Sequence, residues 1–146
     1  MRIDTMFRSL EIADFEKGFP QTLHALSSTA LLSRDRFVET YETRKSQGII
    51  TIVGVVDNAV VCTASYFVET KFIHQGSKVI HVEDVAVNDN FQKQGYGKKI
   101  MDHLEQLALL QGCYKMILNC EEKNIPFYEK CGFVRYETEM RKNLKQ

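Results

Sequence analysis

The stretch Gln92-Lys93-Gln94-Gly95-Tyr96-Gly97-Lys98 lies between an apolar segment at residues 79–87 and a segment in which apolar residues recur at helical spacing. The first segment predicts a β-strand, and the second predicts an amphipathic helix containing Ile100, Met101, Leu104, Leu107 and Ala108. A turn at the start of a helix exposes backbone N–H groups, and glycines at 95 and 97 let the main chain approach a bulky anion. The sequence therefore predicts a phosphate-binding turn between a strand and a helix.

Two familiar phosphate-binding motifs do not fit this turn. A P-loop requires Gly-Lys-Ser/Thr after a longer gap, and the dinucleotide fingerprint requires a third glycine where Ile100 stands. The turn instead resembles the Gln/Arg-x-x-Gly-x-Gly/Ala signature of the GNAT acyl-CoA N-acyltransferases, whose loop grips the pyrophosphate of coenzyme A. The resemblance implies an α/β GNAT fold, in which helices flank a mixed, mostly antiparallel sheet with a splayed central strand. It also implies acetyl-CoA as the cosubstrate, bound by Gln92, Lys93, Gln94, Gly95, Tyr96, Gly97 and Lys98.

Three further segments narrow the resemblance within GNAT. Residues 81–87, 112–115 and 122–133 are similar to the eukaryotic glucosamine 6-phosphate N-acetyltransferases of the amino-sugar nucleotide pathway. The similarity is strongest over residues 71–133 and fainter in the first 60 residues. It implies transfer of the acetyl group of acetyl-CoA to the 2-amino group of D-glucosamine 6-phosphate, by direct attack in a ternary complex. The product would serve UDP-N-acetylglucosamine biosynthesis.

Length and composition independently limit the number of domains and the classes of function. With 146 residues and 44% hydrophobic content, the chain is expected to form one domain over residues 1–146. Nineteen basic residues balance nineteen acidic ones, so no overall field would draw the protein to nucleic acid or to a membrane surface. The first residues lack the apolar region of a signal peptide, and no run approaches 18 apolar residues. We expect a cytoplasmic protein.

The cysteines predict no metal site. Cys62, Cys113, Cys120 and Cys131 show no Cys-x-x-Cys pairing and lie in or beside apolar segments. No zinc motif spacing joins them to the four histidines. We expect reduced, packed thiols and no bound metal.

The remaining segments predict the element order of an α/β domain. Strands are expected at residues 5–10, 49–56, 60–70, 79–87 and 116–118, with a terminal strand from residue 133 onward. Helices are expected at residues 15–26, from the N-cap candidate Ser33 to residue 47, after the glycine turn, and at residues 124–130 before Gly132. The Asp57-Asn58 dipeptide predicts a hairpin turn.

Acetyl transfer from a thioester to an amine needs a positioned neutral amine, a hydrogen-bond donor for the thioester carbonyl and a proton for the leaving thiolate. In GNAT folds, the strand before the glycine loop parts from its neighbour, and its main chain holds the pantetheine arm and the acetyl carbonyl. The resemblance places Val85, Ala86 and Val87 in these positions. They also read as a buried strand, and both interpretations can hold because the backbone does the binding.

Glu83 and Asp84 are adjacent acids in an otherwise apolar strand, where charged side chains need partners. Successive strand side chains point to opposite faces, so only one carboxylate faces the site unless a bulge intervenes. The resemblance places both near the sugar as catalytic candidates, with Asp84 orienting or deprotonating the amine. The alternative is that one of them is an exposed or salt-bridged acid without such a role.

Tyr128 follows Phe127 in a pair that by itself predicts core packing. Residues 124–128 resemble the Asn-x-x-Phe-Tyr pattern of GNAT enzymes, in which the tyrosine hydroxyl lies near the coenzyme sulfur. The resemblance implies that Tyr128 is the general acid for the thiolate, and that Asn124 touches the pantetheine or positions its helix. A tyrosine with the ordinary pKa of about 10 is protonated at neutral pH and needs no special tuning.

The resemblance also assigns residues to the sugar phosphate. Lys71, Phe72, Ile73 and His74, together with Tyr114 and Lys115, match segments that line this pocket in the family. Ser27 stands where the family often has threonine, and either Arg141 or Lys142 would supply a tail cation. Taken alone, each lysine would read as a surface charge.

Asn119 departs from the family, which often has an acidic residue at this position. A carboxylate base there would be missing, so we expect the main-chain carbonyl of residue 119 to contact the amine. The resemblance further implies a homodimer in which C-terminal strand residues of the partner complete each active site.

Two other functions stay open. A GNAT acetyltransferase acting on protein or peptide amines would keep the cofactor residues but need a peptide groove, and the 71–74 and 83–84 segments speak against it. A non-catalytic acyl-CoA-binding sensor is the alternative of another class, which the retention of Tyr128 and Asp84 disfavours.

Overall fold

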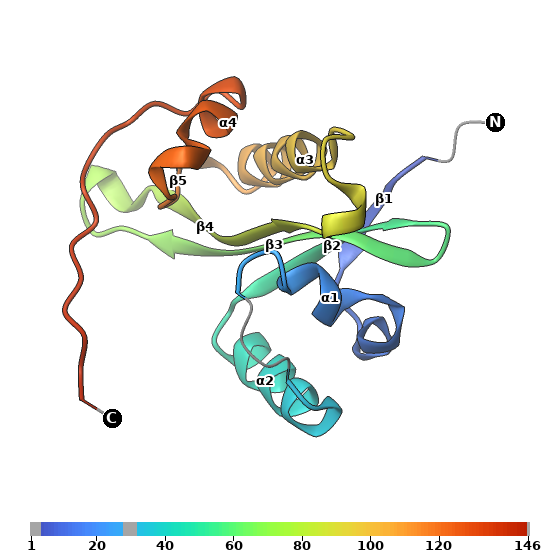
Figure 1. Ribbon diagram of the computed structural model, residues 1–146. Coiled ribbons are helices and arrows are strands. Elements are labelled where there is room, and N and C mark those ends of the chain that lie inside the picture. Colours follow the sequence, from blue (N-terminus) through green and yellow to red (C-terminus); the bar gives the residue numbers. More distant parts are fainter. Residues whose placement is uncertain (1–3, 28–31, 146) are drawn as a thin grey trace.

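The computed structural model describes residues 4–27 and 32–145 and is built around one mixed β-sheet (Figure 1). Within these residues five strands lie side by side in chain order: β1 Met6–Ser9, β2 Ile50–Val56, β3 Ala59–Thr70, β4 Lys78–Val87 and β5 Cys113–Ile117. Strands β1 to β4 are antiparallel neighbours, and β5 runs parallel to β4. The expected mixed, mostly antiparallel sheet is confirmed.

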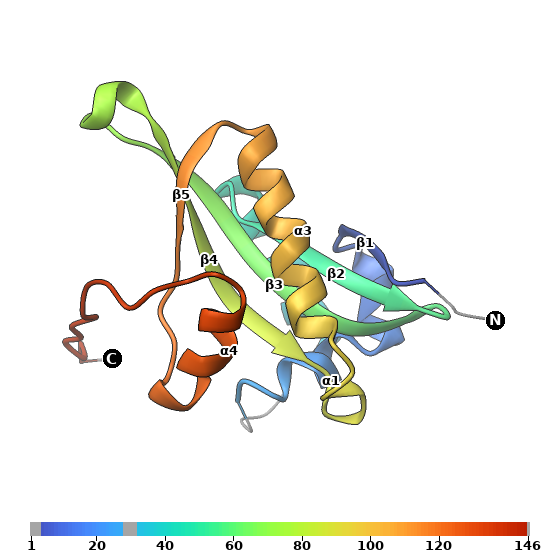
Figure 2. The same ribbon diagram turned by 90° about the horizontal axis from the view of Figure 1, so that it is seen from above.

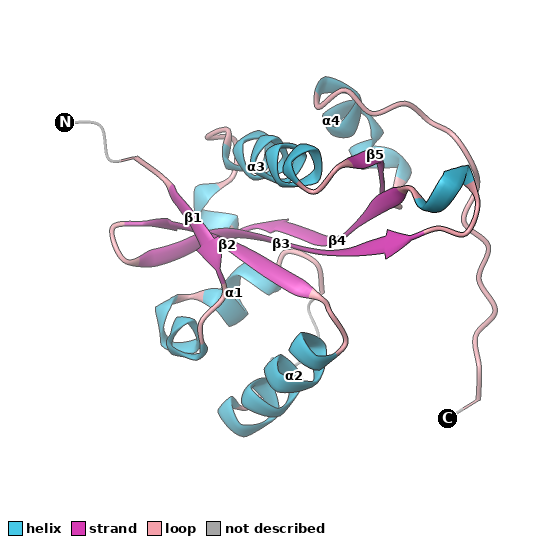
Figure 3. Cartoon of the chain, turned by 180° about the vertical axis from the view of Figure 1, so that it is seen from behind, coloured by secondary structure: helices cyan, strands magenta, loops and turns pink. Residues whose placement is uncertain are grey.

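Helices cover both faces of the sheet (Figures 1 and 3). One face carries the 3₁₀ helix η1 Ile12–Lys17, α1 Phe19–Leu23 and α2 Arg34–Ser46, and the other carries α3 Tyr96–Leu110 and α4 Ile125–Lys130. Three short 3₁₀ helices link elements: η2 His74–Gly76, η3 Asp89–Phe91 and η4 Glu122–Asn124. Seen from above, α3 lies over the middle of the sheet (Figure 2).

The two faces bury separate apolar clusters. Beneath α3, Ile80 and Val82 of β4 pack with Ile100 and Leu104 of the helix, and all four are at most 2% exposed. The face toward α1 and α2 buries a second cluster made of Leu10, Phe19, Phe37, Val53 and Val60. Because strand side chains alternate between faces, Ile80 and Val82 place His81 between them on the α2 face.

Local sequence signals fix a helix start and a turn as expected. The Ser33 hydroxyl oxygen accepts a hydrogen bond from the Arg36 N–H at 3.3 Å and caps α2. Asp57 and Asn58 have φ angles of 49° and 62°, the left-handed conformation that a two-residue hairpin turn requires. Both predictions are confirmed.

Two element predictions are wrong. The helix expected over residues 15–26 is divided, because Gly18 adopts a φ of 99° and ends η1, after which Pro20 lies in the first turn of α1. The strand expected from residue 133 onward is not formed within residues 133–145. Strand backbone needs hydrogen-bond partners, and the described part of this single chain places no strand beside its tail. Strand β5 also begins earlier than expected, at Cys113.

All four cysteines are free thiols, but they are not all packed. Cys62 is buried, and this burial raises the pKa of its thiol to about 12. Cys120 is exposed, so the expectation of a packed thiol is wrong there. Within the described residues, no three His, Cys, Asp or Glu side chains are grouped as a metal site requires. None of the helices in those residues has the length and apolar character needed to cross a membrane.

Candidate active site

The glycine turn lies between the end of β4 and the start of α3, as the sequence predicts. Strand β4 ends at Val87, η3 follows, and α3 begins at Tyr96 with Gly95 as its N-cap. Gly95 has a φ of 86° and no side chain to cap the first-turn N–H groups. The helix end therefore presents backbone donors and a partial positive charge, which suits an anion.

Side chains hold this turn in place. The Gln92 side-chain amide donates to the Val87 carbonyl at 3.4 Å and to Asp89 Oδ1 at 3.2 Å. Lys98 pairs with Asp102 at 3.0 Å, and this hydrogen bond raises the pKa of Lys98. Lys93 and Gln94 are exposed at the outer edge of the turn.

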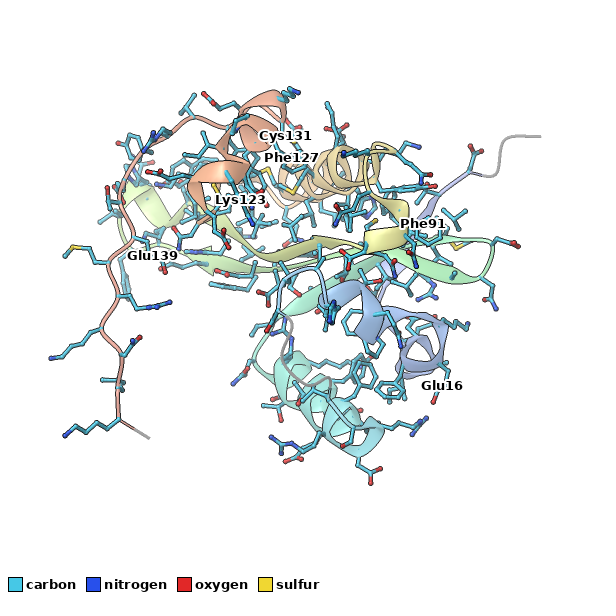
Figure 4. All side chains as sticks on the ribbon, viewed as in Figure 1. Glu16, Phe91, Lys123, Phe127, Cys131 and Glu139 are labelled. Carbon is cyan, nitrogen blue, oxygen red and sulfur yellow. The ribbon has the colours of Figure 1, made fainter. Side chains whose placement is uncertain are left out.

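Gly97 is required by a contact that sequence reasoning missed. A Cβ atom built at Gly97 would lie 3.0 Å from the Phe127 ring, which is closer than side chains normally approach. Figure 4 shows Phe127 of α4 and the C-cap residue Cys131 turned toward α3, and both pack against the main core cluster. Gly97 thus lets α4 approach α3, in addition to the close approach to an anion that the sequence predicts.

Strand β4 is splayed from β5, as expected. Their pairing runs from Lys78–Cys113 to His81–Ile117 and then stops, while β4 continues to Val87 (Figure 2). Val85, Ala86 and Val87 lie in the stretch beyond this pairing, and the last two pair with β3 on the other side. The main-chain N–H and C=O groups on the β5 side of residues 85–87 are therefore not paired with β5.

A β-bulge determines how the two acids are presented. Glu83 pairs with Ser65 and Ala86 with Thr63, so β4 has one more residue than β3 between these pairs. Asp84 lies in the bulge with a φ of 51°. Both carboxylates are exposed, so solvent satisfies them.

Asp84 also lines a cavity of about 290 Å³ between α2 and the sheet. Most of its wall is apolar, but Arg44 donates a hydrogen bond to the Ser65 hydroxyl at 2.8 Å, and Ser65 contacts the Thr51 hydroxyl at 2.9 Å. Sequence reasoning missed this network, because its members come from a helix and two strands that become neighbours only in the folded sheet. The cavity places Asp84 on the sheet face opposite α3.

Tyr128 lies on α4 at the splayed side of β4. Its ring packs edge-on against Phe127 and Phe133, with centroids 4.9 and 5.9 Å away. Burial raises the pKa of Tyr128 to about 12, with further contributions from Cys120 and Cys131, so its hydroxyl holds its proton even more firmly than expected. The aromatic packing and a role for the hydroxyl are compatible, because the ring packs through its faces and edges.

A second cavity of about 320 Å³ brings Tyr128 and Asn119 together. It is also lined by Cys120 and by tail residues as far as Glu139. Asn119 is exposed just beyond β5. Asn124 is the N-cap residue of α4, but its side chain makes no capping hydrogen bond.

The structure brings together the two segments predicted to hold the sugar phosphate. The His74 ring lies 5.2 Å from the Tyr114 ring, and Lys115 Nζ lies 5.3 Å from the Tyr114 ring centre. Phe72 and Ile73 are exposed beside them. Lys78, which begins β4 at this end, is six residues from Asp84, or ~20 Å along an extended strand. This group therefore lies toward the far end of β4 from the two acids.

The other predicted substrate residues are not brought to this group. Ser27 is exposed after α1, and the neighbouring Ser28 and Thr29 lie outside the described residues. Arg141 and Lys142 are exposed on the C-terminal tail, which runs down and away from the sheet in Figure 1.

Comparison with known proteins agrees with this architecture. Residues 6–133 match the acetyltransferase (GNAT) family. The chain is 38% identical over 138 residues to glucosamine 6-phosphate N-acetyltransferase 1 of Dictyostelium discoideum, covering 92% of this chain and 87% of that one. It is 34% identical to glucosamine 6-phosphate N-acetyltransferase of Trypanosoma brucei brucei, covering 97% of each.

A solved structure is similar over almost the full length. The crystal structure of glucosamine-6-phosphate N-acetyltransferase from Arabidopsis thaliana superposes with a TM-score of 0.88 at 32% identity, covering 97% of this chain and 99% of that one. Family match, sequence relatives and fold point the same way. This chain belongs to the GNAT family of acetyltransferases.

Proposed function

We propose that this chain transfers the acetyl group of acetyl-CoA to the 2-amino group of D-glucosamine 6-phosphate, by direct attack in a ternary complex. The observation that carries the proposal is the splayed β4, which has Asp84 in a bulge on one side and Tyr128 on α4 at the other. An amine and a thioester brought together at this strand would meet an acid for the amine and a proton donor for the thiolate. The names of the relatives, which are glucosamine 6-phosphate N-acetyltransferases, support the acceptor.

The cofactor would lie across the splay. The amides of residues 92–98 and the N-terminus of α3 would bind the pyrophosphate of acetyl-CoA. The main chain of Val85, Ala86 and Val87 would hold the pantetheine arm and polarise the acetyl carbonyl, because this row of groups is not used by β5. Asn124 would touch the pantetheine arm from the start of α4.

The reaction divides its proton transfers between two sides of β4. Asp84 orients the neutral amine, with Glu83 as the adjacent second acid. The amine nitrogen attacks the acetyl carbonyl, and Asp84 takes a proton from this nitrogen as its bond to carbon forms. The carbon–sulfur bond then breaks and Tyr128 gives its proton to the thiolate, after which Asp84 releases a proton to solvent and Tyr128 takes one up. The Tyr128 pKa of about 12 keeps its proton in place until the thiolate forms. The main-chain carbonyl of Asn119, in the same cavity as Tyr128, would contact the amine.

We further propose a homodimer that completes the acceptor site. Val134, Tyr136 and Met140 are each at least 79% exposed and stand two and four residues apart in the tail, so an extended strand would place all three side chains on one face. A partner subunit would supply the missing strand neighbour and bury these side chains. Arg141 or Lys142 could then join Ser27, Lys71, His74 and Lys115 around the sugar phosphate.

Residues 1–146 would act as a single catalytic domain in the cytoplasm and serve UDP-N-acetylglucosamine biosynthesis. Free thiols at all four cysteines suit a reducing compartment.

The acceptor can be tested directly by measuring release of free CoA thiol with glucosamine 6-phosphate, glucosamine and a peptide amine. Two charge-assisted hydrogen bonds to the phosphate, at about 1.5–3 kcal/mol each, should favour the phosphorylated sugar by at least ~100-fold in kcat/KM. Equal efficiency on the two sugars would reject the acceptor while leaving the acetyltransferase family intact. Faster acetylation of the peptide would favour a protein N-acetyltransferase.

A further inference from the structure

Three side chains meet on the sheet face that carries α2. His81 Nε2 of β4 lies 2.9 Å from Glu69 Oε1 of β3, and Lys71 Nζ donates to Glu69 Oε2 at 3.4 Å. The hydrogen bond from His81 is the largest cause that lowers the pKa of Glu69, so the carboxylate is ionised at neutral pH. An ionised carboxylate only accepts hydrogen bonds, so His81 Nε2 carries a proton and Nδ1 is the ring's second hydrogen-bonding atom.

The His81 ring is held in a defined orientation. Phe67 is its cross-strand neighbour in the β3–β4 register, and the two rings stack with centroids 4.4 Å apart and an interplanar angle of 8°. Stacking fixes the plane of the ring, and Glu69 fixes its rotation within that plane. This arrangement resembles the way outer residues orient a functional histidine.

The contact with Glu69 brings the Lys71 ammonium closer to Glu83 and Asp84 than the rest of the 71–74 segment lies. Lys71 follows the end of β3, but its ammonium folds back to the Glu69 carboxylate. His81 contacts the other oxygen of the same carboxylate. His81 is three residues from Asp84, or ~10 Å along β4, whereas the far end of the strand is ~20 Å away. A sugar phosphate whose amine lies at Asp84 can extend to the nearer position.

The cluster is accessible and contributes little as a purely structural feature. The side chains of His81, Lys71 and Glu69 are 23%, 30% and 42% exposed. Ion pairs with this much solvent contact typically contribute at most about 1 kcal/mol to stability. One carboxylate faces two groups that can carry positive charge, which leaves the cluster suited to a further anion.

We propose that His81 is a further residue that binds the phosphate of the acceptor, and that Glu69 is a positioning residue that holds His81 and Lys71 around that phosphate. The inference rests on the proposed function, because it takes the acceptor to be a phosphorylated amino sugar with its amine at Asp84. It adds two residues that the sequence motifs did not single out.

The test compares His81→Phe, which keeps the stack on Phe67, with Glu69→Gln, which keeps the side-chain shape. His81→Phe should raise KM for glucosamine 6-phosphate ~10-fold and leave KM for acetyl-CoA and kcat/KM for glucosamine unchanged. Glu69→Gln should raise the same KM ~3-fold, and should have no effect once His81→Phe and Lys71→Ala are both present, because it acts through those residues.

Glu39→Gln is the matched control, because this α2 carboxylate pairs with Arg36 at 2.8 Å and its side chain is 64% exposed. It should leave every constant unchanged. An unchanged KM in His81→Phe would overturn the proposal for His81. A lower KM in Glu69→Gln would show that this carboxylate only repels the phosphate, and would overturn its positioning role.

Calorimetric binding of glucosamine 6-phosphate in the presence of CoA separates this inference from the proposed function. Weaker binding in His81→Phe than in the unmodified protein supports the phosphate contact even if the sugar is not acetylated. Equal binding in the two proteins overturns the contact even if acetylation is efficient.

Discussion

Asp84 combines a left-handed backbone conformation with an exposed carboxylate, so its chemistry can be changed without changing its shape. Asparagine is among the few residues that adopt a positive φ readily, and Asp84→Asn should therefore keep the bulge. We expect kcat to fall by roughly 10²–10⁴-fold, the range for loss of a general base, with acetyl-CoA affinity unchanged.

A matched control is available for this substitution. Asp57 is also exposed with a φ of 49°, but it lies in the hairpin turn between β2 and β3. Asp57→Asn should leave kcat unaltered. Steady-state kinetics of both variants would contradict the assigned role if their kcat values were alike.

Tyr128 can lose its hydroxyl while its ring stays in the aromatic cluster. Tyr128→Phe should cut kcat by roughly 10²–10⁴-fold with little change in thermal stability or acetyl-CoA binding. Since burial raises its pKa to about 12, ionisation of this tyrosine should cause no alkaline loss of activity until the pH approaches that value. Nearly full kcat in a single-turnover measurement would return Tyr128 to a packing role alone.

At the scale of elements, the two ends of α3 offer a comparison between backbone strain and ligand binding. Gly95 and Gly112 flank this helix with φ angles of 86° and 73°, and a Cβ atom at either would meet nothing within 4 Å. Alanine at each position should therefore cost a similar ~1–2 kcal/mol of stability, because both require the left-handed conformation.

Only one of these substitutions lies in the proposed pyrophosphate site. Gly95→Ala should weaken acetyl-CoA binding measured by calorimetry, whereas Gly112→Ala should not. Equal acetyl-CoA affinity in the two variants, with equal loss of melting temperature, would contradict the assignment of residues 92–98 to the cofactor.

Features set by neighbouring residues in the chain were predictable, and features set by distant contacts were not. The Ser33 cap and the Asp57-Asn58 turn depend on local backbone chemistry, so the sequence predicts both. The division at Gly18 was missed because its apolar neighbours continue a helical pattern across it. The contact of Gly97 with Phe127 was missed because it joins α3 to α4.

The same distinction applies to the site. The glycine turn and the splayed strand lie within one continuous segment, which carries the resemblance to GNAT enzymes. The Arg44–Ser65 hydrogen bond and the Glu69–His81 contact join separate elements, and their positions follow from strand register. The alternation of side chains between the two sheet faces, combined with the correct β3–β4 register, would have predicted that Phe67, Glu69 and His81 lie together.

For the whole molecule, the tail decides whether one chain forms a complete site. Residues 133–145 form no strand within the described part of the chain, yet Val134, Tyr136 and Met140 expose apolar side chains at positions that an extended strand would place on one face. Such a segment is suited to add a strand to another copy of the chain, since a symmetric exchange would satisfy both tails at once. The proposed homodimer thus accounts for both the failed strand prediction and the exposed residues.

Subunit exchange tests this arrangement more sharply than size alone. Asp84→Asn should inactivate the acceptor side of a subunit, and the double variant Arg141→Ala with Lys142→Ala should inactivate its tail. If tails act in the partner's site, a mixed dimer contains one site with neither defect. Equal amounts of the two variants, exchanged to equilibrium, should then recover about a quarter of the parent activity, since half of the dimers are mixed and each has one intact site of two. Activity no higher than the mean of the separate variants, or a monomer by sedimentation at micromolar concentration, would contradict the shared site.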